Sequence, residues 1–193
     1  MVSSPKDVLK VYLQGARDVL VWKLEGLSER DMRLPRTPTG TNLLGLVKHA
    51  AIGEVTYFGP TFGRAWPTPE ELVSPDDPDP LAGWHATKTE TAGGIIDFYR
   101  RAQVFADETI DELPLDAIGH VAHWAGAEVT LHEIMVHKTV DAQRHAGHAD
   151  ILREQIDGSI GLLPDVSNLP DGVDWAAYTR RLTAIAAGSG EGS

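Results

Sequence analysis

The chain has 193 residues and a formal net charge of −11, because 28 Asp and Glu residues outnumber 17 Lys and Arg residues. It is long enough to bury the core of one domain without covalent or metal staples. The negative charge argues against binding to nucleic-acid phosphates and to anionic membrane surfaces. The sequence contains no cysteine, which excludes a disulfide scaffold, thiolate metal ligands and a cysteine nucleophile contributed by this chain.

Two features of the sequence bear on location. The opening residues, MVSSPKDVLK, lack the apolar stretch of a signal peptide. No run of about 18 apolar residues is present, which is the length that a membrane-spanning helix requires. We therefore expect a cytoplasmic protein without a transmembrane helix.

Hydrophobic residues at helical spacing predict four long helices. The first begins sharply, because Ser4 can cap it and Pro5 suits the first helical position. The last is expected to end at Gly158, a natural C-terminal cap. The expected ranges are 5 to about 26, 41 or 42 to 58, about 89 to 113, and about 128 to 157. A shorter amphipathic helix is expected from Trp175 to about Ala187.

The connections between these helices are polar or rich in proline. The longest, residues 59 to about 86, contains six prolines and several aspartates, and either a functional loop or a surface connector fits that composition. Alternating strand patterns are essentially absent. The sequence therefore predicts an all-α four-helix bundle with a short extra C-terminal helix. We expect one domain over residues 1–187, with its core at 5–158 and a disordered tail at 188–193.

The most informative pattern is a row of polar residues in the last long helix. His137, Asp141, His145 and His148 follow one another at spacings of four, four and three. These spacings place all four side chains on one face of an α-helix. His49 lies beside the apolar stripe of the second long helix. If the two helices face each other, these side chains can share one metal ion.

A set of two imidazole nitrogens and one carboxylate oxygen suits zinc, nickel or iron(II) better than calcium or magnesium. Three protein ligands leave coordination positions open, as in catalytic metal sites. Glu54 follows His49 by five residues and could orient an imidazole. Spacing alone leaves the alternative that these histidines only pack or hydrogen-bond. By the same reasoning, His120, His123 and His132 are surface or packing residues, and Trp84 and Trp124 are loop anchors.

Two segments resemble motifs of the DinB-like superfamily, in particular its DUF664 branch. Residues 45–58, GLVKHAAIGEVTYF, resemble the second-helix motif, which has a glutamate five residues after a histidine and then an aromatic pair. Residues 137–158, HKTVDAQRHAGHADILREQIDG, resemble the fourth-helix signature. The resemblance covers about residues 5 to 158, and both motifs fall on the expected helices in the expected order.

The resemblance implies an up-up-down-down four-helix bundle, usually a homodimer, that binds a divalent metal. Carried over residue by residue, the metal ligands are His49, Asp141 and His145. The family more often has Glu or His at the middle position, and Asp141 is shorter than Glu by one methylene. His137, one turn earlier, is the alternative third ligand. His148 matches a recurrent position that follows the ligands, and we expect it beside them.

The superfamily includes proteins similar to mycothiol-dependent maleylpyruvate isomerases and S-transferases that use low-molecular-weight thiols. The resemblance therefore implies a metal-dependent thiol transferase or isomerase, in which the metal, zinc or nickel, activates the thiol of a cofactor. One alternative is a non-catalytic metal-binding stress-response protein. Another is a metal-dependent hydrolase with Glu54 or His148 as general base.

Overall fold

The computed structural model describes residues 3–164 and 166–188 of the chain. The chain divides into two compact units, Met1–Ile160 and Gly161–Ser193. The single domain over residues 1–187 stays a prediction. The predicted core, residues 5–158, lies in the first unit. The second contains α6 (Trp175–Gly188), the expected C-terminal helix. The predicted disordered tail, apart from Gly188, lies outside the described residues.

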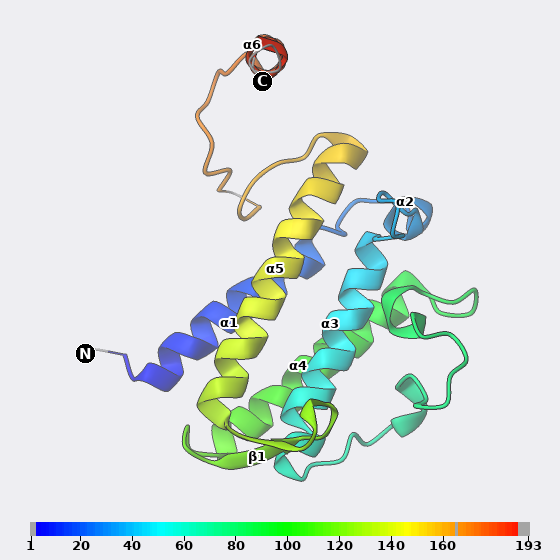
Figure 1. Cartoon of the computed structure of the whole chain (residues 1–193), viewed down its shortest axis with the longest axis vertical. Helices are drawn as coiled ribbons and strands as arrows, with labels where there is room; N and C mark the ends of the chain where they lie inside the picture. Colours follow the sequence, from blue (N-terminus) through cyan, green and yellow to red (C-terminus); the bar gives the residue numbers. More distant parts are fainter. Residues whose placement is uncertain (1–2, 165, 189–193) are drawn as a thin grey trace. The chain divides into compact units, whose positions relative to one another are not determined.

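Four long helices form the first unit, as the hydrophobic spacing predicts (Figure 1). They are α1 (Pro5–Trp22), α3 (Leu43–Phe58), α4 (Ala92–Glu112) and α5 (Leu131–Asp157). Residues 23–26 were expected in the first helix but form a turn, in which the amides of Leu24 and Glu25 donate to carbonyls three positions earlier. Gly158 caps α5 with a φ of 76°, a conformation that glycine adopts without strain. The all-α prediction is thereby confirmed.

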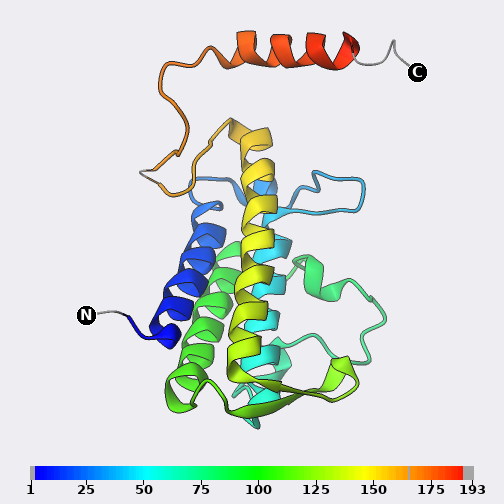
Figure 2. The same ribbon diagram turned by 60° about the vertical axis from the view of Figure 1, so that its left-hand side comes forward.

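The helix directions differ from the expected up-up-down-down order. The Thr109 hydroxyl near the end of α4 donates to the Phe58 carbonyl at the end of α3, at 2.9 Å, so these two helices are parallel. Arg153 near the end of α5 donates to the Lys23 carbonyl just after α1, at 3.1 Å, so α1 and α5 are parallel. The order is therefore up, down, down, up (Figure 2). The up-up-down-down order was taken from the family resemblance, and helical periodicity could not correct it because it carries no information about direction.

The long connection between α3 and α4 makes this order possible. Because α3 and α4 are parallel, residues 59–91 must return along the bundle, a length of about 24 Å for a helix of 16 residues. Along this path lie three short 3-10 helices, η1 (Pro60–Phe62), η2 (Pro69–Glu71) and η3 (Ala82–Trp84). Arg101 on α4 holds Glu71 through two hydrogen bonds. The proline-rich segment is thus a crossover fixed to the bundle.

A short hairpin connects α4 to α5, where the sequence predicted an irregular connection. Strands β1 (Ile118–Val121) and β2 (Ala127–Thr130) pair antiparallel. β2 occupies the residues at which the last helix was expected to begin. A side chain on Gly119 would lie 2.6 Å from the Thr61 carbonyl oxygen, so glycine is needed where β1 crosses η1. Strands of four residues leave too little alternation to be recognised in sequence.

The core lies between the four helices. α3 contributes most to it, because its side chains are buried on nearly every face. One buried cluster joins α3 and α4 to the end of α1, and a second lies near the hairpin between α1, α4 and the start of α5. A further helix, α2 (Glu29–Arg33), lies in the polar connection before α3. None of the described helices is both long and apolar enough to traverse a bilayer.

Candidate metal centre

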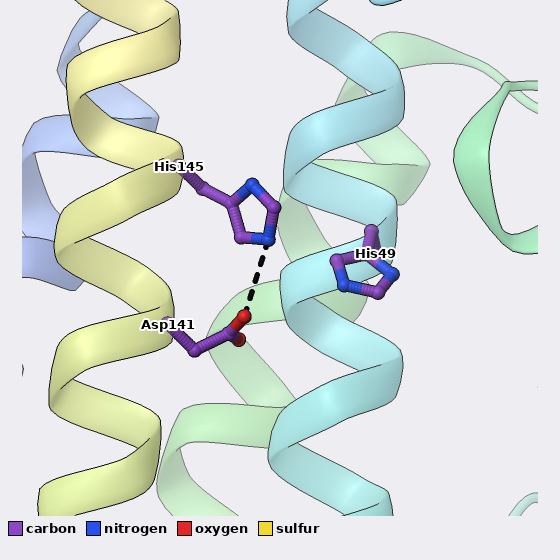
Figure 3. A group of neighbouring side chains, drawn as sticks. All are labelled: His49, Asp141 and His145. Carbon is purple, nitrogen blue, oxygen red and sulfur yellow. Dashed lines mark ion pairs between the residues drawn. The ribbon is translucent and has the colours of Figure 1, made fainter.

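Antiparallel packing of α3 against α5 brings the three proposed ligands together (Figure 3). Asp141 and His145 lie one turn apart on α5 and point toward α3, where His49 is located. One potential ligand atom from each residue can be chosen so that all three lie within 4.8 Å of one another. We call His49, Asp141 and His145 the metal centre.

One pair of atoms in the metal centre has the separation that a shared divalent ion requires. Nε2 of His145 lies 3.2 Å from Oδ1 of Asp141. Two ligand atoms bound about 2.1 Å from one ion in tetrahedral or octahedral geometry lie roughly 3.0–3.4 Å apart. The His49 and His145 rings meet edge to face with centroids 5.0 Å apart. Nδ1, the ring nitrogen of His145 that points away from Asp141, is buried without a hydrogen-bond partner among the described residues.

The electrostatic environment keeps His49 and Asp141 in the forms that bind metal. Burial and the neighbouring His145 lower the pKa of His49 to about 4, so this imidazole is neutral at pH 7. Burial alone would raise the pKa of Asp141. The hydrogen bond from His145 and the ammonium of Lys138 outweigh that effect and hold the pKa of Asp141 well below its usual range. Asp141 is therefore a carboxylate at neutral pH.

Trp84 covers one side of the metal centre. Its ring stacks on His49 with centroids 3.6 Å apart and an interplanar angle of 14°. The crossover can approach α3 this closely because residue 45 is glycine: an added Cβ would lie 1.9 Å from the Trp84 carbonyl oxygen. Lys48 holds the next residue by donating to the His85 carbonyl at 3.1 Å. Trp84 was expected only as a loop anchor, and its contact with His49 gives no signal in the sequence.

Lys138 is a second residue that the sequence analysis missed. Its side chain is only 2% exposed, and its Nζ lies 2.7 Å from Oδ2 of Asp141. The signal that could have identified it is its position three residues before Asp141, which places both side chains on the same face of α5.

His137 lies outside the metal centre, with a different set of neighbours. Its ring lies 4.8 Å from the rings of both Tyr57 and Trp124. The Tyr57 hydroxyl is 3.0 Å from Nε2 of His123 in the hairpin connection. We call Tyr57, His123, Trp124 and His137 the aromatic cluster. The group of side chains close enough to share one ion does not include His137. His148 is exposed, with its ring 5.5 Å from that of His145.

Glu54 takes part in a buried ion pair with α1. Its two carboxylate oxygens accept hydrogen bonds from Nε and Nη2 of Arg17, at 3.0 and 2.7 Å, and both side chains are only 1% exposed. Arg17 also contacts Asp107 on α4 at 2.7 Å. The predicted contact of Glu54 with an imidazole is replaced by this pairing. His120 and His132 are exposed, as expected of surface residues.

Comparison with known proteins relates the chain to one family and to solved structures. The model of a family described as mycothiol-S-transferase matches residues 8–158. A crystal structure described as a conserved protein from Enterococcus faecalis has 15% identity and a TM-score of 0.65, covering 82% of this chain and all of that one. At this identity, the likeness shows the fold alone. No curated protein matches the sequence.

Proposed function

Because the family model matches most of its length, the chain belongs to the mycothiol S-transferase family of DinB-like proteins, and we propose that it is a metal-dependent thiol S-transferase. Its substrates would be a low-molecular-weight thiol of the mycothiol type and a small electrophile. The observation that carries the proposal is the convergence of His49, Asp141 and His145 from two helices.

Each ligand has a defined role in this proposal. These residues would hold a divalent ion, zinc or nickel by the chemistry of the ligands, and such an ion would favour the thiolate form of a cofactor thiol at neutral pH. His49 and His145 would supply imidazole nitrogens, and Asp141 would supply one negative oxygen. The three leave coordination positions open for the thiol. The reacting sulfur must come from the cofactor, because the chain has no cysteine.

The surroundings of the metal centre support a reaction that needs a nucleophilic thiolate. Trp84 lies flat against His49 and keeps bulk water from that face of the imidazole. At 40% exposure, the same tryptophan also presents apolar surface beside the ligands, against which a substrate can pack. His148 and His137 lie at opposite ends of the ligand row and are the nearest further imidazoles on α5.

Metal content and thiol dependence test the proposal together. We expect the purified protein to contain a divalent metal by elemental analysis and to conjugate thiols to electrophiles when assayed with a panel that includes mycothiol. Chelation should abolish turnover, and zinc or nickel should restore it. The His145→Ala variant should lose both metal and turnover. Arg144→Ala is the matched control, because its side chain lies on the exposed face of the same helix turn. Turnover that persists after complete removal of the metal would contradict the proposal.

A non-catalytic metal-binding stress-response protein is the second candidate. It is favoured by the pairing of Asp141 with a buried lysine, which already neutralises the carboxylate. It predicts that zinc raises the melting temperature while the thiol panel shows no turnover.

A hydrolase has less support, because Arg17 engages Glu54, one of the two residues considered as its general base. Isomerase activity and a homodimer remain predictions that maleylpyruvate turnover and light scattering can test.

A further inference from the structure

Lys138 is a buried cation whose charge is matched by a single carboxylate. Burying an ammonium group is costly unless it is paired. Among the described residues, the ion pair formed by its Nζ is with Asp141, at 2.7 Å. The ring of Tyr57 supplies a weaker attraction, with its centroid 5.5 Å from Nζ. The position of the ammonium is thus set by Asp141 on one side and by an aromatic face on the other.

The two oxygens of Asp141 have different partners. Oδ2 accepts from Lys138, and Oδ1 lies 3.2 Å from Nε2 of His145. The ammonium therefore holds the oxygen that faces away from the imidazole and leaves the other oxygen turned toward it. Groups that hydrogen-bond the outer atom of a ligand in this way fix its orientation at metal sites.

Gly53 on α3 makes room for the ammonium. A Cβ at this position would lie only 2.6 Å from Nζ of Lys138 but 3.6 Å from its Cε, which is an ordinary contact. Glycine is unfavourable in the interior of a helix. At this position it leaves the ammonium in place, whereas a larger residue would make Nζ shift.

We propose that Lys138 is a positioning residue of the metal centre, which fixes the carboxylate of Asp141 so that Oδ1 faces the ion, and that Gly53 is the notch that admits its ammonium. This inference rests on the metal-binding part of the proposed function and not on the transfer reaction. It also accounts for the short side chain at position 141. A carboxylate that is oriented by the Lys138 ammonium does not need the extra methylene of glutamate.

The test is a double-mutant cycle on metal affinity. Apo protein is titrated with Zn²⁺ against a competing chelator, and the visible spectrum of the Co²⁺-loaded protein reports the ligand geometry. We expect Lys138→Met, which keeps the apolar stem and loses Nζ, to weaken Zn²⁺ binding by about 10–100-fold and to alter the Co²⁺ spectrum. Circular dichroism checks that the variant is folded. A lysine with only a structural role would leave both readouts unchanged in a folded variant.

Gly53→Ala supplies the second arm of the cycle. In the wild-type background the added methyl should displace Nζ and weaken Zn²⁺ binding. In the Lys138→Met background it should have almost no further effect, because the nearest remaining atom lies at ordinary contact distance. Gly15→Ala in α1 is the matched control, since its added Cβ meets nothing within 4 Å.

The outcomes separate this inference from the proposed function. Equal or tighter Zn²⁺ binding by folded Lys138→Met, or additive effects of the two substitutions, would overturn the role of Lys138 and leave the metal centre standing. Absence of Zn²⁺ binding by the wild-type protein would overturn both. If Lys138→Met does not fold, the Gly53→Ala variant alone decides, because normal Zn²⁺ affinity and an unchanged Co²⁺ spectrum in it contradict the proposal.

Discussion

The metal centre and the aromatic cluster both contain two histidines and both use side chains of α3 and α5, to which the aromatic cluster adds His123 and Trp124 from the hairpin connection, yet they differ in chemistry. The metal centre has a carboxylate between its imidazoles, and that carboxylate is held by a buried lysine. In the aromatic cluster the two imidazoles contact a phenol and an indole instead. The comparison teaches that histidines one or two turns apart on one helix can meet quite different partners. Asp141 and His49 are near His145, whereas aromatic rings surround His137.

The strongest test of the comparison removes one histidine from each region. His49→Ala should reduce Zn²⁺ affinity by more than about 100-fold. This loss is larger than that expected when a residue that only hydrogen-bonds to a ligand is removed. His137→Ala should leave it within about threefold, because His137 contacts aromatic rings outside the ligand group. Calorimetric titration of apo protein measures both. A large loss of Zn²⁺ affinity in His137→Ala would show that His137 is the third ligand. The two regions would then not differ in metal binding.

Substitution of Asp141 tests the next largest effect. Asp141→Asn keeps the size of the side chain but removes its charge, and we expect Zn²⁺ affinity to fall by about 10–100-fold. Asp141→Glu should keep or improve the affinity, because the longer carboxylate still reaches the ion. The chelator-competition titration checks both variants. An Asp141→Asn protein that binds Zn²⁺ normally would show that the carboxylate only pairs with Lys138.

The pH dependence of the unfolding free energy should differ between the two regions by a smaller amount. Burial lowers the pKa of His49 to about 4 and also lowers that of His137. A histidine whose pKa is lower in the folded protein contributes stability above its unfolded pKa of about 6.5, and this contribution is lost as the pH falls through that value toward the folded pKa. Urea unfolding of metal-free protein should therefore show stability falling between about pH 6.5 and pH 4. His49→Gln should flatten this dependence more than His137→Gln, and an equal or opposite ranking would contradict the burial argument.

The smallest expected effect concerns the aromatic cluster alone. Tyr57→Phe removes the hydroxyl that lies 3.0 Å from Nε2 of His123 and leaves the ring in place. We expect the free energy of unfolding to fall by about 1 kcal/mol, the usual net contribution of one hydrogen bond. Zn²⁺ affinity should stay unchanged. Urea denaturation and the Zn²⁺ titration measure the two quantities, and a coupled loss of metal would show that the cluster supports the ligands.

The sequence was sufficient to predict the long helices and the three ligand candidates, for different physical reasons. Hydrophobic periodicity reports which face of a helix is buried, and it located α3 and α5 closely. Side chains four residues apart share a helix face, which joined Asp141 to His145. Joining His49 to them required the resemblance to known motifs, because nothing in local spacing says which helices face each other.

What the sequence could not supply are the contacts between distant segments. Trp84 reaches His49 only because the crossover returns along the bundle, and that path depends on the direction of α4. Lys138 was overlooked because lysine is rarely buried, and its burial depends on the notch at Gly53. Glu54 was placed near an imidazole, but its partner is Arg17, from a helix whose position the pattern does not give.

The distance along the chain between α3 and α5 has a consequence for the unfolded protein. The metal centre joins segments separated by about 90 residues of sequence, a separation at which a cross-link removes much of the conformational entropy of an unfolded chain. In a chain without cysteine, an ion bound by the three side chains that would activate a thiol would thus also act as a reversible cross-link. Removal of the ion would then lower the unfolding free energy of the whole protein and would not affect the site alone.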